Sequence, residues 1–458
     1  MDKFRNVLMK AFYNSPYIIK KLFINLYGYD LMRKRFSGEY KYYFNFFTNT
    51  QWWESEKIKE FQIKKLKDIL EIAYTKVPYY KKLFWDYGLS PRDFNSIKDL
   101  EKLPIITKEA IKKNFNSFIN KDLKNVNFME RTTSGSTGAK FHFFIPKELY
   151  FNINYALIYR FYKWAGIDKF DKRVTIGARY FTDKPPYWIF NKAENQLILS
   201  IHHLKKEIID IYIDKILEFK PIFIQGHPSG IYYLAKRILE REKYLSVKSI
   251  FTTGETLSEF QREIIENAFN TKIFEAYGSG ETIIAAFECE KHTGFHEASE
   301  LGIIELKKNR DNSNLYKIIG TSLWNTAMPF IRYEMGDLVE VSHNKFCSCH
   351  RKLPLKIKKI TGRIDDIIFS PEGRLILPVT IRMVIKPLLG NFENYQFQQI
   401  EKKEYSVLLE GRIEEGREKL FIKVLNEILG DSAKIKVRKV EKIITKVGKV
   451  RNVVNLYK

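Results

Sequence analysis

The chain has few cysteines and no long uncharged segment. Only three cysteines occur among its 458 residues. No uncharged run is long enough to span a bilayer, and six charged side chains between Asp2 and Lys21 interrupt any apolar core of a signal peptide. Internal repeats and low-complexity segments are likewise absent. These absences exclude a transmembrane helix and a cleaved leader, and they predict a cytoplasmic protein in which disulfides are not expected.

Acidic residues are too few to balance the basic ones. The 78 Lys and Arg exceed the 54 Asp and Glu and give a net charge of +24, which predicts anionic partners such as nucleotides, polyanionic polymers or a membrane surface. The excess is spread along the chain rather than gathered in one tail, so a nucleic-acid partner is not expected. Residues 1–50, rich in aromatic and basic side chains, fit peripheral contact with the inner face of the membrane. A packed pair of amphipathic helices is the simpler interpretation.

The pattern of apolar residues predicts an α/β chain of more than one domain. At 458 residues the chain exceeds the size at which one core usually stops growing. Leu66, Leu70 and Ala73 recur at helical spacing in a mostly helical segment over 55–125. Short β-branched and aromatic runs that end in glycine-containing turns then alternate with helical runs. Four of these runs are residues 174–181, 222–230, 249–255 and 271–278.

A polar segment at 360–368, ITGRIDDII, separates two apolar parts of the chain. Such a polar hinge predicts a domain boundary. Beyond it, strand-like and helical stretches alternate and suffice for a small α+β domain. We therefore predict a large N-terminal domain over residues 1–362, with a helical segment over about 1–125, and a small C-terminal domain over 363–458.

The segment Arg131–Phe141, RTTSGSTGAKF, gathers hydroxyls and glycines. The backbone N–H groups of such a turn can bind anions. The segment is not a Walker P-loop, because Ala139 separates the last glycine from the lysine and no hydroxyl follows the lysine. It predicts either a phosphate loop or an ordinary solvated turn. The residues concerned are Ser134, Gly135, Ser136, Thr137, Gly138 and Lys140.

Acidic and aromatic residues follow two of the strand-like runs. Gly254 and Glu255 end one run, and Tyr277, Gly278 and Glu281 end the next. Ligands of α/β sheets bind at the carboxyl ends of the strands. The two carboxylates therefore suit Mg²⁺ or nucleotide hydroxyls, and Tyr277 offers a flat face to a purine. Taken singly, each turn is equally compatible with ordinary loop chemistry.

Further charged turns occur toward the end of the chain. Asp337 follows a strand-like run, where its carboxylate could accept both hydroxyls of a ribose. Arg363 and Asp365 lie in the polar boundary segment, and Lys449 lies in VGKVRNVV, which alone would be a flexible basic loop. His227 in QGHPSG is a candidate for a substrate pocket, although a hydrogen-bonded loop histidine is the commoner outcome.

All three cysteines lie near histidines. One stretch is Cys289-Glu-Lys-His292-Thr-Gly-Phe-His296, and the other is Cys347-Ser-Cys349-His350. A tetrahedral Cys₃His zinc site needs such a set of thiolates and imidazoles. The spacing differs from that of a standard zinc finger, and three cysteines can also coincide by chance. With four protein ligands no position stays open for water, so the zinc would be structural.

The order of these turns resembles a known family. A Ser/Thr/Gly loop, GE, YGxxE, RYxxGD, GRxDD and a late GK follow one another, an order similar to that of the adenylate-forming superfamily of acyl-CoA synthetases. Within it the chain resembles the phenylacetate–CoA ligases, and LYGYDLMRKRFSGEY at 26–40 is similar to the opening of the CapK-type branch found with capsule genes. The resemblance covers essentially the whole chain. It implies a large N-terminal domain of mixed sheets and helices with a small mobile C-terminal lid.

The resemblance implies a role for each of the early turns. Residues 134–140 would be the phosphate loop. Glu255 and Tyr277 would frame the adenine. Glu281 would hold Mg²⁺, and Asp337 would bind the ribose hydroxyls.

The later turns carry implied roles as well. Arg363 would lie near the ribose, Asp365 would be the hinge about which the lid rotates, and Lys449 would reach the α-phosphate and the carboxylate. The chain departs from the family pattern at Gly280, where a hydroxyl usually precedes the magnesium glutamate, and near its end, where the usual proline before Gly-Lys is missing. The first departure puts the acid end of the pocket in question.

Some phenylacetate–CoA ligase relatives carry a similar Cys-x₆-His…Cys-x-Cys pattern. On that match the zinc ligands would be Cys289, His296, Cys347 and Cys349, with His292 and His350 as alternatives for the fourth position.

The function implied is that of an ATP- and Mg²⁺-dependent, AMP-forming ligase. A carboxylate would attack the α-phosphorus of ATP, and CoA or an amine would then accept the acyl group. The acid would be an aryl or acyl acid, or a sugar-linked carboxylate or amino acid if the capsule-branch resemblance holds. One rival is a non-catalytic polyanion-binding protein on this fold, and another is a phosphotransferase that would release ADP. The sequence leaves the oligomeric state open.

Overall fold

The structure is a computed structural model of the chain. The residues that it describes are 12, 15–133, 141–177, 184–203, 206–309, 314–344, 347–363, 367–373, 375–376, 381, 385, 394–410, 417–441, 443 and 452–457.

The structure confirms the helices that were predicted in the N-terminal part of the chain. They are α2 (Tyr17–Phe36), α3 (Tyr40–Thr50), α4 (Ser55–Lys76) and α5 (Pro78–Asp86). In α4, Leu66, Leu70 and Ala73 are buried as their spacing predicts. Later in the predicted helical segment over 55–125, residues 97–113 form a 3₁₀ turn (Ile97–Lys102) followed by the short α6 (Lys108–Lys113) in place of one long helix. Pro104 lies between the two pieces, and a proline interrupts a continuous helix there.

The largest element is a twelve-stranded sheet in the order β11-β12-β13-β14-β10-β9-β8-β7-β6-β3-β5-β4. The strands from β5 through β3, β6 and β7 to β8 pair in parallel, and the pairs from β8 to β11 are antiparallel. The parallel and the antiparallel strands together form one mixed sheet, as predicted for the large domain. The strands are β3 (Arg173–Gly177), β4 (Ile189–Asn191), β5 (Gln196–Ser200), β6 (Phe223–Gly226), β7 (Ser249–Thr253), β8 (Ile273–Gly278), β9 (Ala285–Glu288), β10 (Phe295–Glu297), β11 (Gly302–Lys308), β12 (Leu315–Ser322), β13 (Tyr333–Val341) and β14 (Leu355–Arg363).

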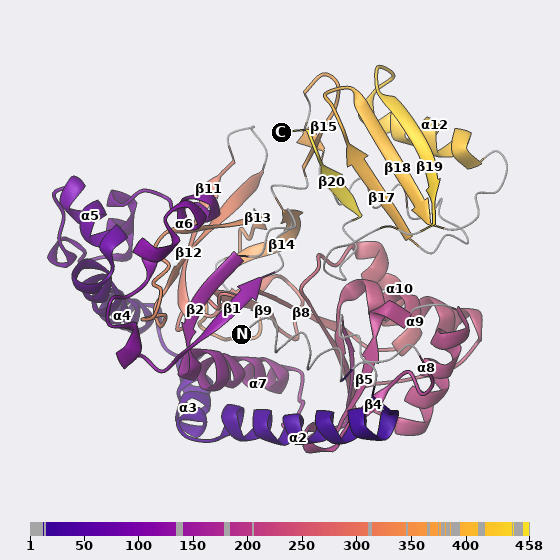
Figure 1. Cartoon of the computed structure of the whole chain (residues 1–458), viewed down its shortest axis with the longest axis horizontal. Coiled ribbons are helices and arrows are strands. Elements are labelled where there is room, and N and C mark those ends of the chain that lie inside the picture. The colour runs from indigo at the N-terminus through magenta and orange to yellow at the C-terminus, as the bar shows by residue number, and fades with distance from the viewer. Residues whose placement is uncertain are drawn as a thin grey trace.

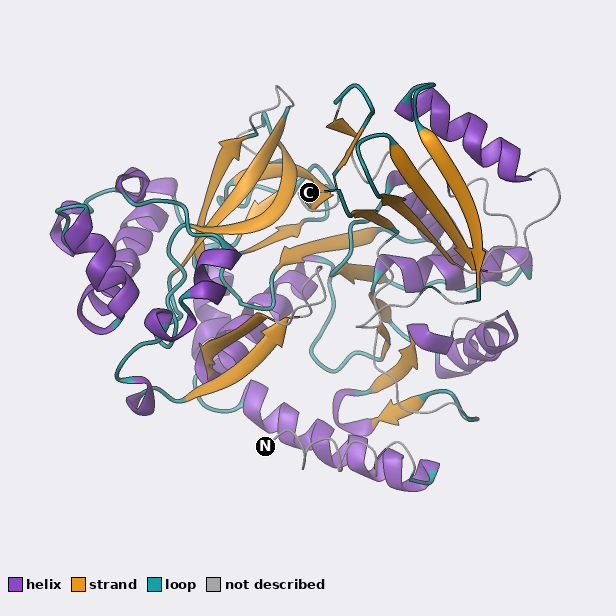
Figure 2. Ribbon diagram, turned by 45° about the horizontal axis from the view of Figure 1, so that its top comes forward, coloured by secondary structure: helices purple, strands orange, loops and turns teal. Residues whose placement is uncertain are grey.

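Helices cover both faces of the parallel half (Figures 1 and 2). Isoleucines of β6, β7 and β8 pack with α8 (Lys206–Phe219), α9 (Pro228–Glu240) and α10 (Glu259–Phe269). The alternating phenylalanines face α7 (Asn154–Trp164), where the rings of Phe161 and Phe251 lie 5.1 Å apart. Successive side chains of a strand point to opposite faces, so continuous apolar runs are what a sheet covered on both sides requires.

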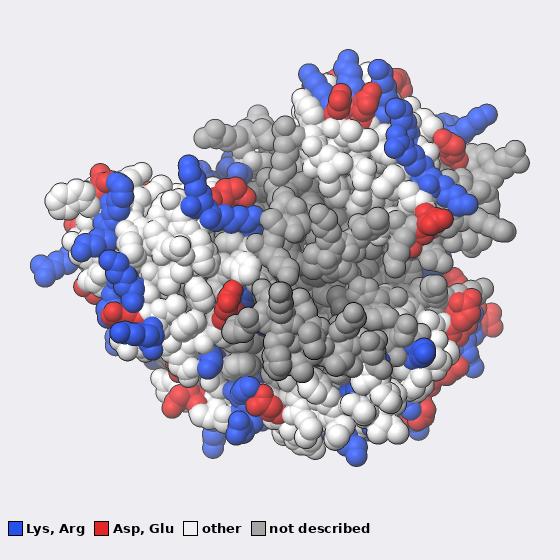
Figure 3. Space-filling view, viewed as in Figure 1, with Lys and Arg blue, Asp and Glu red and all other residues white. Residues whose placement is uncertain are grey.

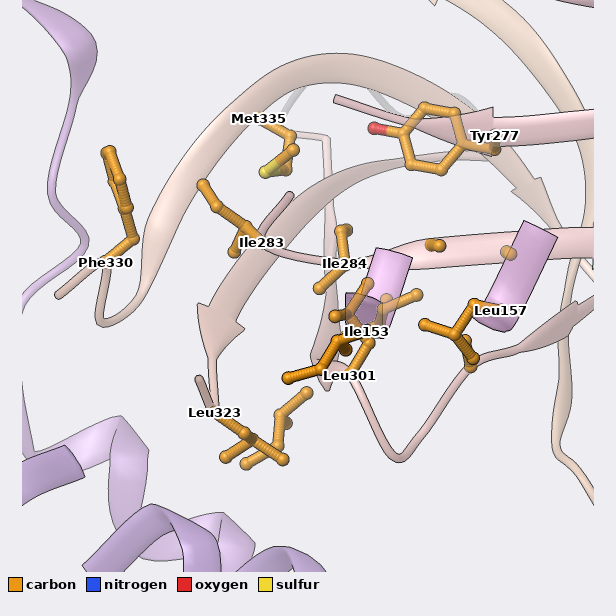
Figure 4. Close-up of a cluster of buried hydrophobic side chains, with 14 of the residues drawn as sticks. Ile153, Leu157, Tyr277, Ile283, Ile284, Leu301, Leu323, Phe330 and Met335 are labelled. Atoms are coloured by element: carbon orange, nitrogen blue, oxygen red, sulfur yellow. The ribbon is translucent and has the colours of Figure 1, made fainter. Parts of the chain in front are cut away.

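The apolar core continues under the antiparallel half. Figure 4 shows Ile283, Ile284 and Leu301 in a cluster with Leu157, and Tyr277 at the edge of that cluster. A separate strand pair, β1 (Phe128–Thr133) and β2 (Phe141–Pro146), packs on this core through Phe141. The core therefore fixes the strand ends that carry the candidate site.

The C-terminal part has its own small sheet and core, at the upper right of Figure 1. Its sheet order is β19-β18-β17-β20, and α12 (Arg417–Leu429) packs on it through buried Phe421 and Leu425. The predicted strands and helix here are confirmed. The strands are β17 (Asn394–Gln399), β18 (Glu404–Glu410), β19 (Lys434–Val440) and β20 (Val453–Asn455), and a two-stranded pair, β15 (Ile368–Phe369) with β16 (Leu375–Ile376), precedes them.

Lys and Arg side chains cluster over the C-terminal part in Figure 3. Lys434, Lys436 and Arg438 of β19 are exposed. The predicted α/β class, a large mixed sheet with helices plus a small α+β unit, is confirmed, and the exact domain boundary stays a prediction. Within the described residues, no helix combines the length and the apolar character that crossing a bilayer requires.

Candidate active site

One cavity of about 910 Å³ lies at the carboxyl ends of the parallel strands. Residues of these strands, of α7 and of β13 line it. Ligands of α/β sheets bind at this edge. The cavity has two ends. We call the side lined by Lys108, Tyr277, Glu281, Asp337 and Arg363 the β13 end. We call the side lined by Arg35, Arg173, Thr175, Glu194, Gln196 and Gln225 the β3 end. The predicted residues that line the cavity are Gly254, Tyr277, Gly278, Glu281, Asp337 and Arg363.

Three predicted residues from three strands meet at the β13 end. The Tyr277 hydroxyl donates to Asp337 Oδ2 at 2.9 Å, and Arg363 Nε lies 3.7 Å from Asp337 Oδ1. Asp337 and Arg363 are direct partners in the β13–β14 pairing. Burial, followed by the neighbouring Asp337 carboxylate, raises the pKa of Tyr277 well above its usual value, so the phenol stays a hydrogen-bond donor. The site thus presents a ring, a carboxylate and a guanidinium side by side.

Glu281 is a buried carboxylate beside two cations. Burial raises the pKa of Glu281, and the charges of Lys108 and Arg363 oppose that rise. Lys108 lies on the cavity wall because Ile106 pairs with Tyr333, which holds the start of α6 against β13. Burial lowers the pKa of Lys108, while Glu281 raises it. Two cations around one carboxylate suit the binding of a phosphate chain together with a metal ion.

Lys108 was missed in the sequence. Thr107 caps α6 by accepting the Ala110 N–H at 3.2 Å, and a Thr cap followed at once by a lysine is the only local signal. A cation at a helix N-terminus is disfavoured by the helix dipole, so the Thr107-Lys108 step was unusual enough to have been noticed.

The departure from the family pattern at Gly280 has a packing reason. A Cβ built on Gly280 would come within 2.9 Å of the Thr133 methyl group. Thr133 ends β1 on the cavity wall. A serine or threonine at position 280 would therefore need Thr133 to move, which is consistent with glycine at the position where the resemblance implies a hydroxyl.

Two candidates make contacts that the sequence did not specify. The Glu255 carboxylate accepts the N–H of Ser229 at 3.1 Å, in the first turn of α9. A carboxylate at that place is favoured by the helix dipole. His227 lines the cavity and contacts the Thr253 carbonyl at 3.1 Å through Nδ1. This is the hydrogen-bonded loop histidine named as the commoner outcome, placed on the cavity wall.

Several predicted residues lie outside the described residues. They are the phosphate-loop candidates Ser134, Gly135, Ser136, Thr137, Gly138 and Lys140, the hinge candidate Asp365 and the candidate catalytic Lys449. Their roles stay predictions. The cavity wall does include Thr132 and Thr133, the residues immediately before the first of these segments.

The predicted zinc ligands lie together away from the cavity. The ligand atoms of Cys289, His296, Cys347 and Cys349 all lie within 4.8 Å of one another. Cys289 Sγ and Cys347 Sγ are 3.6 Å apart, and Cys349 Sγ is 3.3 Å from His296 Nε2. Sulfur atoms bound to one tetrahedral zinc lie about 3.8 Å apart, given Zn–S bonds of about 2.3 Å. The geometry is therefore compact enough for one zinc ion.

His296 is oriented for this role by its other ring nitrogen. Nδ1 contacts the Leu353 carbonyl at 2.9 Å, which leaves Nε2 facing the cysteines. Burial lowers the pKa of His296, which favours the neutral form that binds metals. Of the two alternatives, His350 is exposed, and His292 lies 3.4 Å from Glu288 through Nδ1. Neither belongs to the cluster.

Comparison with known proteins supports this picture. No protein-family model matches the chain. It is 28% identical over 402 residues to Protein CapK of Staphylococcus aureus, covering 86% of each chain. It is 22% identical over 402 residues to phenylacetate–coenzyme A ligase of Thermus thermophilus, covering 82% of this chain and 85% of that protein. A crystal structure of 2-hydroxyisobutyryl-CoA ligase with a bound acyl-AMP matches with a TM-score of 0.66 at 18% identity, covering 88% of this chain and 90% of that one. The resemblance predicted from the order of the motifs is confirmed.

Proposed function

We propose, from the premise that this chain is a homologue of Protein CapK and the phenylacetate–CoA ligases, that it uses ATP to activate a carboxylic acid as an acyl-adenylate. The predicted enzyme class, an AMP-forming ligase, is confirmed by the phenylacetate–CoA ligase relatives. The observation that carries the proposal is the meeting of Tyr277, Glu281, Asp337 and Arg363 at one end of one cavity.

The proposed reaction needs two anions to meet. A carboxylate oxygen attacks the α-phosphorus of ATP, the bond to the β-phosphate oxygen breaks, and pyrophosphate leaves. Lys108 and Arg363 would offset the repulsion between the two anions, since cations held in place beside the reacting groups stabilise negative charge. Asp337 would accept the ribose hydroxyls, and the Tyr277 ring would lie against the adenine. Glu281 would hold Mg²⁺, whose charge neutralises phosphate oxygens.

The acyl group would then pass to CoA or to an amine. Holding the acyl group and its acceptor in the reactive geometry supplies much of the rate enhancement of such a transfer. The proposed hinge at Asp365 and the proposed catalytic Lys449 belong to this model of a rotating lid over residues 363–458. A role in surface-polysaccharide biosynthesis is part of the proposal and is supported only by the likeness to Protein CapK.

Product analysis tests the activity. Purified protein is incubated with ATP, Mg²⁺ and a panel of carboxylic acids, and AMP, ADP and pyrophosphate are quantified. AMP and pyrophosphate in equal amounts, only in the presence of an acid, support the proposal. ADP would instead indicate a phosphotransferase, and no nucleotide turnover with tight polyanion binding would indicate the non-catalytic rival. CoA or an amine added afterwards identifies the acceptor.

We also propose that the four-residue cluster binds one structural zinc ion. It would join the loop after β9 to the loop between β13 and β14. Elemental analysis should find one zinc per chain, and a chelator should lower the melting temperature. Cys349→Ala should lose the metal, whereas His350→Ala, on an exposed neighbour outside the cluster, should keep it. A metal-free protein of unchanged melting temperature would disprove the site.

We propose further that α2 contacts an anionic membrane surface. Ile18, Leu22 and Leu26 share one stripe of the helix and are 79%, 60% and 61% exposed. Exposed Lys21 and Arg33 lie near them. An apolar stripe with basic neighbours suits the headgroup region of an anionic bilayer.

Vesicle sedimentation tests the membrane contact. The protein should sediment with vesicles that contain phosphatidylglycerol, and Leu22→Glu should abolish this. Trp85→Glu changes an apolar residue on α5 that is more exposed, at 85%, and should not. Equal binding of both variants, or dimers in place of vesicle binding, would contradict the proposal.

A further inference from the structure

The β3 end of the cavity has a hydrogen-bonding floor. Thr175 Oγ1 accepts from Gln225 Nε2 at 2.9 Å and from Gln196 Nε2 at 2.6 Å, so neighbouring strands β6, β3 and β5 share one polar network. The alternate residues of β3, Val174 and Ile176, point to the other face and pack with the helices there. The polar face is therefore the one directed at the cavity.

Charged groups extend this floor. Glu194 pairs with both Arg35 and Arg173, the latter at 2.9 Å, and all three side chains line the cavity while at most 10% exposed. Burial raises the pKa of Glu194, but the two guanidinium groups outweigh it and hold that pKa below its usual value. The trio carries one net positive charge. Buried charges without full pairing are costly, so a ligand that brings hydrogen-bond acceptors would be favoured here.

Apolar side chains also line the cavity, among them Ile158, Phe161 and Phe251. Gln225 Oε1 already accepts from Tyr162 and Gln196 Oε1 from Asn191, so the groups that a ligand can engage here are the second N–H of each amide and the Thr175 O–H. An aryl or alkyl acid that reaches the β3 end offers these donors no acceptor. Each buried polar group left unpaired weakens binding considerably. A cavity of about 910 Å³ is at the large end of ligand pockets, which span about 300–1,000 Å³, and it has room for a nucleotide and a bulky acid together.

We propose that the acid is a hydroxyl-rich carboxylate of the sugar-acid type, whose hydroxyls bond to Thr175, Gln225 and Gln196. This rests on the proposed adenylation, since the carboxylate must reach the β13 end. It narrows the acid to one class and sets aryl acids aside.

Binding of two adenylate mimics tests the proposal. Sulfamoyladenosine conjugates of glucuronic acid and of phenylacetic acid are titrated into the full chain by calorimetry. We expect the glucuronyl conjugate to bind at least tenfold more tightly. In Thr175→Val and Gln225→Leu this preference should fall at least tenfold. Thr361→Val is the matched control, because it removes a buried hydroxyl that donates to the Leu338 carbonyl and does not line the cavity, and it should keep the preference.

The outcomes separate the two proposals. If the phenylacetyl conjugate binds as tightly or more tightly, or if the variants keep the preference, the sugar-acid proposal is wrong while adenylation stands. If neither conjugate binds, the proposed function itself fails, and the substrate class fails with it. A loss of fold in a variant is detected by its melting temperature, and the second variant then decides.

Discussion

The two ends of the cavity differ in how well their residues can be predicted from the sequence. At the β13 end, Tyr277, Asp337 and Arg363 stand in short motifs whose order along the chain predicted a shared site. At the β3 end, Thr175 and Gln196 stand in ordinary strands and carry no motif, and Gln225 opens the QGHPSG stretch, in which only His227 was singled out. Reaction chemistry that every substrate shares requires fixed groups at strand ends. Recognition of one particular acid is spread over the faces of several strands, where only the three-dimensional pairing brings the residues together.

The largest expected effect is at Glu281. Glu281→Gln removes the one charge that would hold Mg²⁺ at the β13 end, and we expect AMP formation to fall by about 10²–10³-fold, the size of loss seen when a preorganised charge-stabilising group is removed. Initial rates at saturating ATP measure this. Glu263→Gln, on an exposed face of α10, should keep the rate. Comparable rates in the two variants would place the magnesium site elsewhere.

Lys108 gives the next effect. We expect Lys108→Ala to lower kcat/KM for ATP by about tenfold, or about 1.4 kcal/mol, because the cation beside Glu281 is lost. Lys113→Ala changes an exposed lysine on the same short helix and should have no effect. The decline should be steeper at low ionic strength, where phosphate attraction is least screened. A salt-independent loss would point to a change in folding rather than to phosphate binding.

Lys108 also shows where prediction from the sequence stops. The strand that carries Tyr277 near its end could be predicted because apolar runs and glycine turns are local signals, whereas Asp337 lies inside β13 and not after a strand, as had been predicted. The wall that Lys108 forms depends on the long-range pairing of Ile106 with Tyr333, and no local pattern encodes a partner so distant in the sequence. The same holds for Arg35, which comes from α2 to meet Glu194. The cysteine cluster lies between these cases, since its residue types were informative and their proximity was not.

Tyr277 should show a smaller effect. Tyr277→Phe keeps the ring against the adenine and removes the hydroxyl that donates to Asp337 at 2.9 Å. A hydrogen bond to a charged group is worth about 1.5–3 kcal/mol, so we expect KM for ATP to rise about tenfold with little change in kcat. Tyr80→Phe removes another buried hydroxyl, which donates to the Pro329 carbonyl at 3.0 Å, and should alter stability alone. An unchanged KM in Tyr277→Phe would contradict the proposal that Asp337 binds the ribose.

The smallest effect on activity is expected at Glu275 of β8, which does not line the cavity. This carboxylate faces Arg262 and Glu288 on the side of α10, two residues before the ring of Tyr277. Burial raises its pKa to about 8, with Glu288 adding to the rise and Arg262 opposing it. The folded chain therefore holds a proton that the unfolded chain, with a pKa near 4.3, has already released. Stability should consequently fall as the pH rises from about 4.3 through 8.

Glu275→Gln removes this titration from the same strand that serves the site. We expect the free energy of unfolding of the variant to rise relative to that of the original chain between pH 6 and pH 9. The full difference corresponds to about 1.4 kcal/mol for each unit by which the pKa of Glu275 differs between the folded and the unfolded chain. AMP formation at neutral pH should stay within twofold. Glu259→Gln is the matched control on α10, because a hydrogen bond from Lys359 lowers the pKa of Glu259. Its stability difference should be flat over that range. A variant of Glu275 that tracks this control would mean that Glu275 is ionised in the folded chain. A loss of activity without a pH-dependent gain in stability would mean that Glu275 itself takes part in the chemistry that we assign to the cavity.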